Sequence, residues 1–131
     1  MALKGLIDHT LKTEPVDKDR VILTGLSMGG FATWDLLAAH PDLAAAAVPI
    51  CGRGDPAKAE KFKNVPIHVY HGKKDDAVPF KNSEDMVEAL KKAGGKPEFT
   101  IFPDIGHDSW TAAYADPKLY EWMLEQKRAA K

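Results

Sequence analysis

Short apolar strands alternate with helices along almost the whole chain, and this alternation limits the folds that it can adopt. Segments rich in β-branched and apolar residues predict four strands, at residues 20–24, 45–50, 67–71 and 98–102. The hydrophobic spacing around them predicts helices at residues 3–11, 28–40, 58–63, 83–93 and 116–127. Strands joined through helices form βαβ units. The pattern therefore predicts an α/β fold with a mostly parallel sheet of about four strands and flanking helices.

The chain has 131 residues, the size of one domain, and no Pro/Gly/Ser-rich linker divides it. We therefore expect a single domain over residues 1–131. The formal net charge is −1, so nothing in the composition attracts a nucleic acid or an anionic membrane surface. No apolar run reaches membrane-spanning length, the first residues lack a long apolar leader, and Cys51 is the single cysteine. We expect a cytoplasmic protein without an internal disulfide, unless a secretion signal precedes Met1.

A tight turn with a serine at its centre joins the first strand to the following helix. Residues 25–30 read Gly-Leu-Ser-Met-Gly-Gly, so a G-x-S-x-G motif lies between a strand and a helix, where it presents a nucleophile. Such a turn strains the serine backbone, and side chains at Gly25 and Gly29 are expected to collide with neighbouring backbone. We interpret Ser27 as a nucleophile and the Met28 backbone N–H as an oxyanion donor. The alternative is a plain turn in which Ser27 only caps the helix.

A serine nucleophile needs a general base, and the base needs a carboxylate to orient it. In this kind of sheet the three side chains follow strand ends in the chain order serine, acid, histidine. Asp75 and Asp76 follow the third predicted strand, and His107 follows the fourth. The order Ser27, then one of these two aspartates, then His107 is therefore satisfied, and only one aspartate of the pair can point at His107.

The other four histidines fit surface or structural positions better than the role of base. His9 lies on a short predicted helix and His40 at a helix end, so we expect both at the surface. His68 lies within the third strand, and His71 ends that strand, where we expect its side chain to brace the following loop. None of the four follows the fourth strand, so His107 is the predicted base.

Two further interpretations concern a different acid for His107 and a metal site. Asp104 and Asp108 lie too near His107 in sequence to be its expected partner, although Asp104 stays open as an alternative acid. A hydrolytic zinc site would leave the G-x-S-x-G turn unexplained, and the sequence has neither H-E-x-x-H nor C-x-x-C. Its candidate ligands would be His68, His71, Asp75 and His107. We expect neither a metal nor a cofactor.

These motifs resemble those of the α/β-hydrolase family. Residues 25–30 resemble its nucleophile elbow, and residues 71–79 (His-Gly-Lys-Lys-Asp-Asp-Ala-Val-Pro) resemble its H-G-x-x-D-x-x-V-P acid loop. Residues 106–110 (Gly-His-Asp-Ser-Trp) resemble the base loop of its bacterial esterase branch, which includes carboxylesterases, phospholipase-like esterases and predicted peptidases. The acid of the acid loop is its first aspartate, so the resemblance implies Asp75 rather than Asp76.

The resemblance extends over residues 15–124 and leaves a difference on the N-terminal side. Family members carry several more strands before the elbow strand, and a loop among them supplies the second oxyanion-hole donor. Few residues precede that strand here, and no H-G-G-G segment lies upstream of Ser27. Loss of one such donor typically costs about 10²–10³ in kcat. We therefore expect either a weak enzyme or a second donor from elsewhere in this chain or from a partner chain.

The same difference predicts how copies of the chain associate. Four strands in sequential order with right-handed crossovers place their helices on one face of the sheet. The closing helix at residues 116–127, with Trp122 and Met123, is then almost alone on the other face, and the elbow strand is an edge. Exposed apolar faces and sheet edges favour association. We expect a homo-oligomer, most simply a two-fold dimer.

The resemblance implies a serine carboxylesterase that forms an acyl-enzyme with a small-molecule ester. We expect short acyl chains, because so small a chain shows no lid-like segment or long apolar tunnel. Trp110, three residues past His107, is expected either to line the substrate pocket or to pack in the core. One alternative is a catalytically weak or inactive C-terminal fragment of a larger hydrolase that folds by self-association. A second alternative is a serine peptidase.

Overall fold

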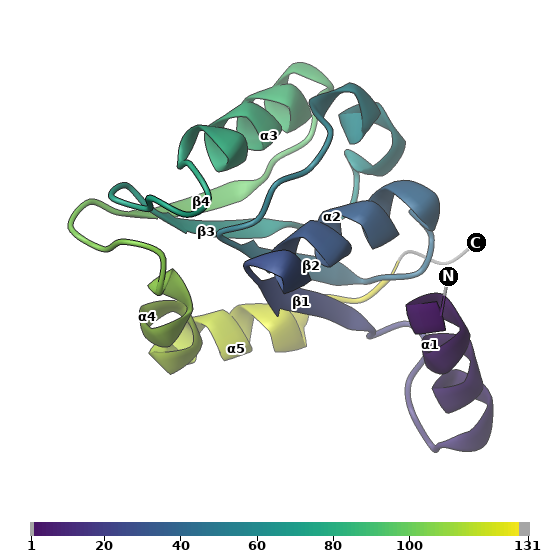
Figure 1. Cartoon of the computed structure of the whole chain (residues 1–131). Helices are drawn as coiled ribbons and strands as arrows, with labels where there is room; N and C mark the ends of the chain where they lie inside the picture. Colours follow the sequence, from purple (N-terminus) through teal and green to yellow (C-terminus); the bar gives the residue numbers. More distant parts are fainter. Residues whose placement is uncertain (1, 129–131) are drawn as a thin grey trace.

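A computed structural model of the chain describes residues 2–128 and contains one four-stranded sheet. All neighbouring strands pair in parallel, and their spatial order is the same as their order in the sequence (Figure 1). The strands are β1 (Ile22–Leu26), β2 (Ala46–Ile50), β3 (His68–Gly72) and β4 (Glu98–Phe102). The predicted α/β class, strand number and sequential parallel order are confirmed.

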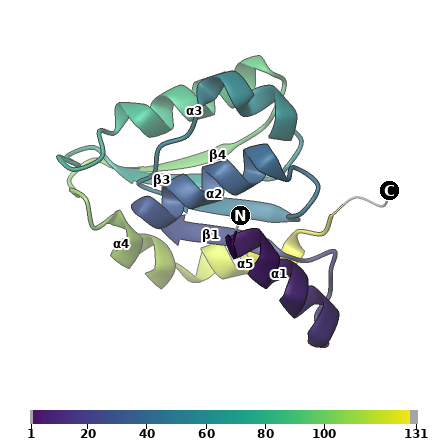
Figure 2. The same ribbon diagram turned by 45° about the vertical axis from the view of Figure 1, so that its right-hand side comes forward.

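Helices lie on both faces of this sheet. One face carries α2 (Met28–Ala39), the 3-10 helix η1 (Pro56–Phe62) and α3 (Lys81–Lys92) (Figure 1). The other carries α4 (Ser109–Ala115) and α5 (Pro117–Glu125) (Figures 1 and 2). Among the described residues, no helix combines the length and the apolar character needed to cross a membrane.

Two apolar cores fill the space between the sheet and these helices. The core under α2 and α3 includes Trp34, Leu37, Val69, Met86 and Leu90. The core under α4 and α5 includes Val48, Ile50, Tyr70, Ala113 and Leu119. Every residue of β2 is buried, as expected for a central strand covered on both faces. Burying a large apolar side chain stabilises a fold by roughly 1.5–3 kcal/mol relative to leaving it exposed, so the cores hold the strand ends that carry the site.

The closing segment differs from its prediction. The sequence predicts one helix over residues 116–127, whereas α4 precedes it and α5 begins at Pro117. Asp116 caps α5 by accepting a hydrogen bond from the Lys118 N–H, and Pro117 occupies the first turn, where its missing N–H costs nothing. The closing helix is therefore not alone on its face. Trp122 and Met123 lie on the predicted face and pack against the core under α4 and α5.

Strand β1 begins and ends two residues later than predicted. The prediction of residues 20–24 assumed that Gly25 ends the strand, but Gly25 pairs with Pro49 of β2 and the ladder continues to Leu26. Arg20 instead belongs to the preceding turn, because its N–H donates to the carbonyl of Asp17. The chain therefore reaches the elbow directly from the paired strand.

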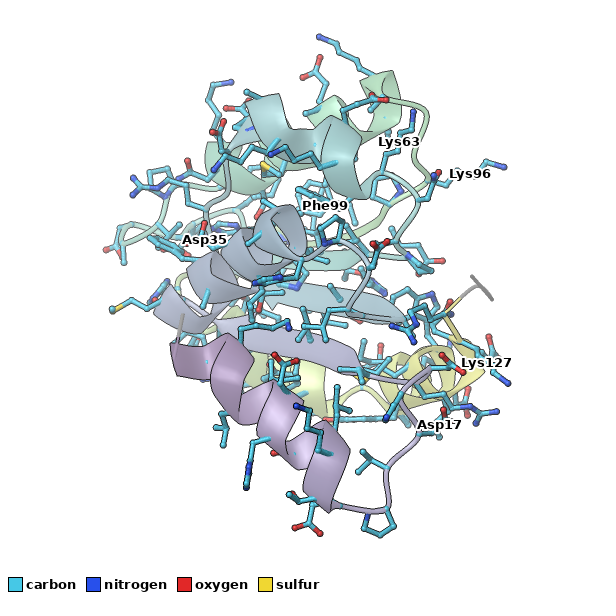
Figure 3. The ribbon with its side chains drawn as sticks, turned by 90° about the vertical axis from the view of Figure 1, so that its right-hand side faces the viewer. Asp17, Asp35, Lys63, Lys96, Phe99 and Lys127 are labelled. Atoms are coloured by element: carbon cyan, nitrogen blue, oxygen red, sulfur yellow. The ribbon has the colours of Figure 1, made fainter. Side chains whose placement is uncertain are left out.

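Helix α1 (Ala2–Thr13) stands beside β1 at the edge of the sheet (Figures 2 and 3). Its apolar residues lie on one face of the helix, yet Leu6 is 61% exposed and Leu3 is also exposed. Ile7 is the residue of this face that packs against the core under α2. The edge position of β1 is confirmed, and much of the apolar surface of α1 faces solvent.

Candidate active site

The turn between β1 and α2 holds Ser27 in a backbone conformation that L-amino acids rarely adopt, with φ 52° and ψ −117°. Such a conformation costs roughly 1–3 kcal/mol and persists only where the surrounding structure imposes it. Part of that constraint is the Ser27 N–H, which donates to the carbonyl of Ile50 at the end of β2. The Ser27 side chain makes no capping hydrogen bond to α2. The alternative in which Ser27 only caps the helix is therefore wrong.

Glycine is required at one of the two positions where we expected crowding. A Cβ on Gly25 would lie 2.3 Å from the carbonyl oxygen of Gly29, so no side chain fits there. A Cβ on Gly29 would meet no heavy atom within 4 Å, so the expectation for Gly29 is wrong. Gly29 is exposed, whereas the next residue, Gly30, faces the sheet, and its Cβ would lie 2.8 Å from the Ile50 carbonyl oxygen. Helix α2 thus approaches the sheet through Gly30.

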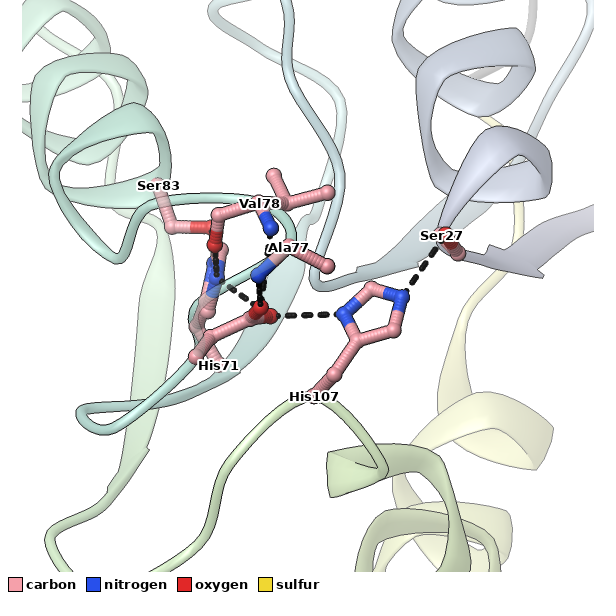
Figure 4. A network of polar contacts seen from close by, with 7 residues as sticks. Ser27, His71, Ala77, Val78, Ser83 and His107 are labelled. Carbon is pink, nitrogen blue, oxygen red and sulfur yellow. Dashed lines mark hydrogen bonds and ion pairs between the residues drawn. The ribbon is translucent and has the colours of Figure 1, made fainter.

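Three predicted residues meet at the carboxyl ends of the strands (Figure 4). Nε2 of His107 lies 3.0 Å from Oγ of Ser27, and Nδ1 of His107 lies 2.8 Å from Oδ2 of Asp75. An ionised carboxylate only accepts hydrogen bonds, so Nδ1 carries a proton and donates a hydrogen bond to Asp75. The Nε2 lone pair then accepts a hydrogen bond from the Ser27 hydroxyl. The arrangement connects a hydroxyl, a base and a carboxylate in the order that nucleophilic catalysis needs.

Asp75 is held as a carboxylate inside the protein. Its side chain is fully buried, and Oδ1 accepts hydrogen bonds from the Ala77 N–H at 2.9 Å and the Val78 N–H at 2.8 Å. Burial alone raises the pKa of Asp75, but the hydrogen bonds from His107, Val78 and Ala77 outweigh it and hold the pKa below its usual value. Asp76 is exposed. Asp75 is therefore the aspartate of this pair that faces His107.

The remaining acids near His107 lie elsewhere. Asp104 forms an ion pair with Lys74 at 3.7 Å, and its side chain is 91% exposed. Asp108 is exposed and precedes the first residue of α4. The open alternative of Asp104 as the acid is therefore wrong in this structure, because the hydrogen bond of His107 Nδ1 goes to Asp75.

The loops that carry Asp75 and His107 are fastened to each other through the backbone. The Lys73 N–H donates to the Phe102 carbonyl at 2.9 Å, and the Lys74 N–H donates to the Ile105 carbonyl at 3.0 Å. A Cβ on Gly72 would lie 2.3 Å from the carbonyl oxygen of Gly106, so only glycine permits this approach. This contact was not predicted, although a glycine directly after His71 at the end of β3 indicates a close approach of backbone.

Met28 lies next to Ser27, and Trp110 contacts His107. Met28 is the first residue of α2, where no intrahelical carbonyl is available to its N–H, and its side chain is 80% exposed. The Trp110 ring meets the His107 ring edge to face at 5.3 Å, and it also packs against the core under α4 and α5. Trp110 therefore packs on the core, one of the two positions expected for it, and also contacts His107; its role in a substrate pocket stays a prediction.

Of the four side chains weighed for a zinc site, His71 and His107 both contact Oδ2 of Asp75, whereas His68 lies apart from them. His68 points to the opposite face of the sheet, where Nε2 contacts Oγ of Thr100 at 2.8 Å. Among residues 2–128, the group with metal-ligand chemistry is Cys51, Asp75 and His107, whose ligand atoms lie within 4.8 Å of one another. Asp75 and His107 already bond to each other, and burial raises the pKa of the Cys51 thiol, which keeps it in the protonated form that binds metals poorly.

His71 braces the acid loop, as predicted. Its ring is fully buried, with Nε2 2.8 Å from the Val78 carbonyl oxygen and 3.2 Å from Oδ2 of Asp75. Nδ1 lies 2.6 Å from Oγ of Ser83, near the start of α3. No sequence pattern predicts that Ser83 contacts His71, because this contact depends on how α3 packs against β3.

Residues 3–130 match the sequence profile of the dienelactone hydrolase family. Among curated proteins, the chain is 33% identical over 129 residues to an Escherichia coli (strain K12) protein named "Putative carboxymethylenebutenolidase", with 83% of this chain and 47% of that protein covered. Among solved structures, a thermostable esterase is 38% identical with a TM-score of 0.94, covering 97% of this chain and 36% of that chain. The acylaminoacyl peptidase of Pyrococcus horikoshii shares the fold at 19% identity and a TM-score of 0.86, covering 99% of this chain and 28% of that chain.

The matches confirm the resemblance to α/β-hydrolases that the three motifs indicate. The chain spans about half the length of the curated relative and about a third of the esterase. The matched part includes the elbow, the acid loop and the base loop.

Proposed function

Since the chain belongs to the dienelactone hydrolase family of α/β-hydrolases, we propose that it hydrolyses carboxylic esters with Ser27 as the nucleophile. The proposal depends above all on one observation, the hydrogen-bonded path from Ser27 through His107 to Asp75 with distances of 3.0 and 2.8 Å. The 38% identity to a thermostable esterase supports an ester as the substrate class. The peptidase likeness, at 19% identity, concerns the fold alone.

In the first half of the reaction, Oγ of Ser27 attacks the ester carbonyl carbon while Nε2 of His107 takes the hydroxyl proton. The carbonyl oxygen becomes an oxyanion, which the Met28 N–H at the start of α2 stabilises. The buried carboxylate of Asp75 balances the charge on His107. His107 then donates its proton to the leaving alcohol, and the carbon–oxygen bond to that alcohol breaks, which leaves an acyl-enzyme on Ser27.

In the second half, a water molecule replaces the alcohol. The water oxygen attacks the acyl carbon while His107 takes a proton from the water, and the Met28 N–H again stabilises the oxyanion. The bond between Oγ of Ser27 and the acyl carbon breaks, His107 returns the proton to Oγ, and the carboxylic acid leaves. The hydroxyl, the base and the carboxylate are then in their starting state.

We propose short acyl chains as the preferred substrates. Met28, which follows Ser27, is exposed, and Trp110, whose ring contacts His107, is partly exposed. These two side chains offer apolar contact to a small acyl group at the surface. Longer chains gain little from such a site, because each added methylene remains in water instead of contributing about 0.8 kcal/mol on burial.

Hydrolysis of p-nitrophenyl acetate, butyrate and octanoate by the purified chain and by Ser27→Ala tests the proposal. We expect saturable hydrolysis with kcat/KM highest for the two shorter esters, and its loss in Ser27→Ala. His107→Gln should lose activity as well, whereas the matched change His9→Gln, on the exposed face of α1, should not. Equal rates for the original chain and Ser27→Ala would overturn the proposal. Cleavage of p-nitroanilides at rates comparable to esters would favour a peptidase.

A further inference from the structure

A second histidine contacts the carboxylate that orients His107. Nε2 of His71 lies 3.2 Å from Oδ2 of Asp75, the same oxygen that accepts the hydrogen bond from His107 (Figure 4). We propose that His71 and Ser83 are positioning residues, which hold the Asp75 carboxylate in the orientation that His107 needs. This inference rests on the proposed function, because it describes how the proposed catalytic acid is aligned.

The partners of His71 determine where its ring carries a proton. Burial lowers the pKa of His71, so the ring is neutral and has one N–H. Nε2 faces two acceptors, the Val78 carbonyl oxygen at 2.8 Å and Oδ2 of Asp75 at 3.2 Å, and therefore carries the proton. Nδ1 then has a lone pair and accepts a hydrogen bond from the Ser83 hydroxyl at 2.6 Å. Ser83 thus serves as the hydrogen-bond partner of the tautomer that donates toward Asp75.

The ring of His71 is also fixed in place by packing. Phe80 contacts it edge to face at 5.7 Å, and Phe80 itself stacks on Phe99 of β4 at 5.5 Å. Ser83 and His71 are both fully buried, so no water competes with their hydrogen bond. A side chain held by both packing and hydrogen bonds has no other low-energy arrangement, so it can fix the position of a group that it contacts.

His71 controls both oxygens of Asp75. It contacts Oδ2 directly, and it holds the carbonyl of Val78, whose own N–H donates to Oδ1 at 2.8 Å. Without the Nε2–H of His71, the turn that presents Ala77 and Val78 to Oδ1 loses an anchor, and Oδ2 loses one of its two neighbours. The carboxylate is then free to rotate away from His107. Misplacement of a catalytic group by about 1 Å costs on the order of 10² in rate.

Two substitutions of His71 separate this role from simple filling of the core. The amide nitrogen of Gln reaches the position of Nε2, whereas the amide of Asn reaches only that of Nδ1. We expect His71→Asn to lower kcat by about 10²-fold with KM unchanged, and His71→Gln to lower it by less than about tenfold. Equal loss in both variants would overturn the inference.

His68 provides a matched control on the same strand. It is also a largely buried histidine in a hydrogen bond, but its ring stacks on Tyr70 at 4.3 Å on the opposite face of the sheet. His68→Asn should weaken the fold while leaving kcat unchanged. Ser83→Ala should lower kcat, as His71→Asn does, because the His71 ring loses a hydrogen bond that fixes its position. Loss of kcat in His68→Asn equal to that in His71→Asn would count against positioning by His71.

Proton NMR gives a readout that does not depend on activity. The proton between Nδ1 of His107 and Asp75 should give a far-downfield resonance in the original chain and in His71→Gln, and none in His71→Asn. Retention of that resonance in His71→Asn would overturn the inference even in an active protein. If the original chain has no Ser27-dependent esterase activity but the resonance shows this pattern, the proposed function fails and the positioning role of His71 stands.

Discussion

Nδ1 of His107 lies 2.8 Å from Oδ2 of Asp75, a contact between two loops whose residues are 32 positions apart in the sequence. The contact depends on the ends of β3 and β4, which are neighbours in the sheet. Asp76 follows Asp75 in the chain but is exposed, so the two adjacent aspartates have opposite environments. This contrast allows the acid to be tested against a control that differs from it by one position.

Asp75→Asn should reduce kcat for a short-chain ester by roughly 10³–10⁴-fold, because an amide cannot stabilise a charged His107 and favours the wrong tautomer. Asp76→Asn should change kcat by less than about threefold, since a surface charge exerts little effect. Steady-state kinetics of both variants with p-nitrophenyl acetate measure the difference. The reverse ranking, or equal losses, would contradict the assignment of Asp75.

Gly25→Ala should abolish activity and destabilise the fold by about 3 kcal/mol, because its Cβ would lie 2.3 Å from the Gly29 carbonyl oxygen. Gly29→Ala should be neutral or stabilise the fold by up to about 1 kcal/mol, because its Cβ meets open space and alanine favours a helix. Urea unfolding of the two variants compares these effects. A Gly29→Ala variant as unstable as Gly25→Ala would disprove the crowding argument.

The free energy of unfolding should fall as the pH is lowered from 7.5 to 5. Burial lowers the pKa of His68 and of His71 from 6.5, so both rings stay neutral in the fold and take up protons only on unfolding. The stabilisation is therefore fully present above pH 6.5 and is lost below it, with a slope of up to about 1.4 kcal/mol per pH unit for each histidine. Urea titrations should show a flatter slope in His71→Gln and an unchanged slope in His9→Gln. Equal slopes in all three proteins would contradict burial of neutral rings.

The open edge of the sheet predicts self-association. β1 is an edge strand, and a mostly apolar groove beside it is lined by Ile22, Tyr120, Met123 and Leu124, together with Arg20. Leu124 is 75% exposed, and Leu6 of α1 is exposed on the other side of the same edge. We predict a two-fold dimer in which the β1 edges of two copies lie together, because this covers both apolar surfaces and pairs the strand edges.

Light scattering after size-exclusion chromatography at micromolar concentration should give the mass of a dimer. Leu124→Glu should shift the chain to the monomer, because it places a charge in the predicted interface. Ile101→Glu provides the control, since Ile101 is exposed on β4, at the opposite edge of the sheet. A monomer for the original chain, or equal shifts in both variants, would contradict association through β1.

Most of the site was predictable because each of its parts is local in sequence. The G-x-S-x-G turn needs only a strand before it and a helix after it, so the position of Ser27 between β1 and α2 is predictable from the sequence around residues 25–30. Asp75 and Asp76 have the same chemistry, and only the pattern of the acid loop favours the first. The structural reason is the turn after β3, in which the N–H groups of residues 77 and 78 point at the Asp75 carboxylate.

The parts that sequence reasoning missed depend on packing between distant segments. Helix α4 is short, and its mixture of aromatic residues, threonine and alanine has no clear spacing of apolar positions, so it is recognised only once it covers β2 and β3. The sequence does not reveal that a side chain at Gly29 would meet open space, because crowding depends on which face of α2 meets the sheet. The contact of Ser83 with His71 requires α3 to lie against β3.

The central claim is that Ser27 is an activated nucleophile, and reaction with a fluorophosphonate tests it without any assumption about the substrate. After incubation of the folded chain, digestion and mass spectrometry, we expect one phosphonyl adduct on the peptide that contains Ser27. The adduct should be absent in Ser27→Ala and in the chain denatured before the reaction. No adduct on the folded chain, or an adduct that persists in Ser27→Ala, would contradict the claim.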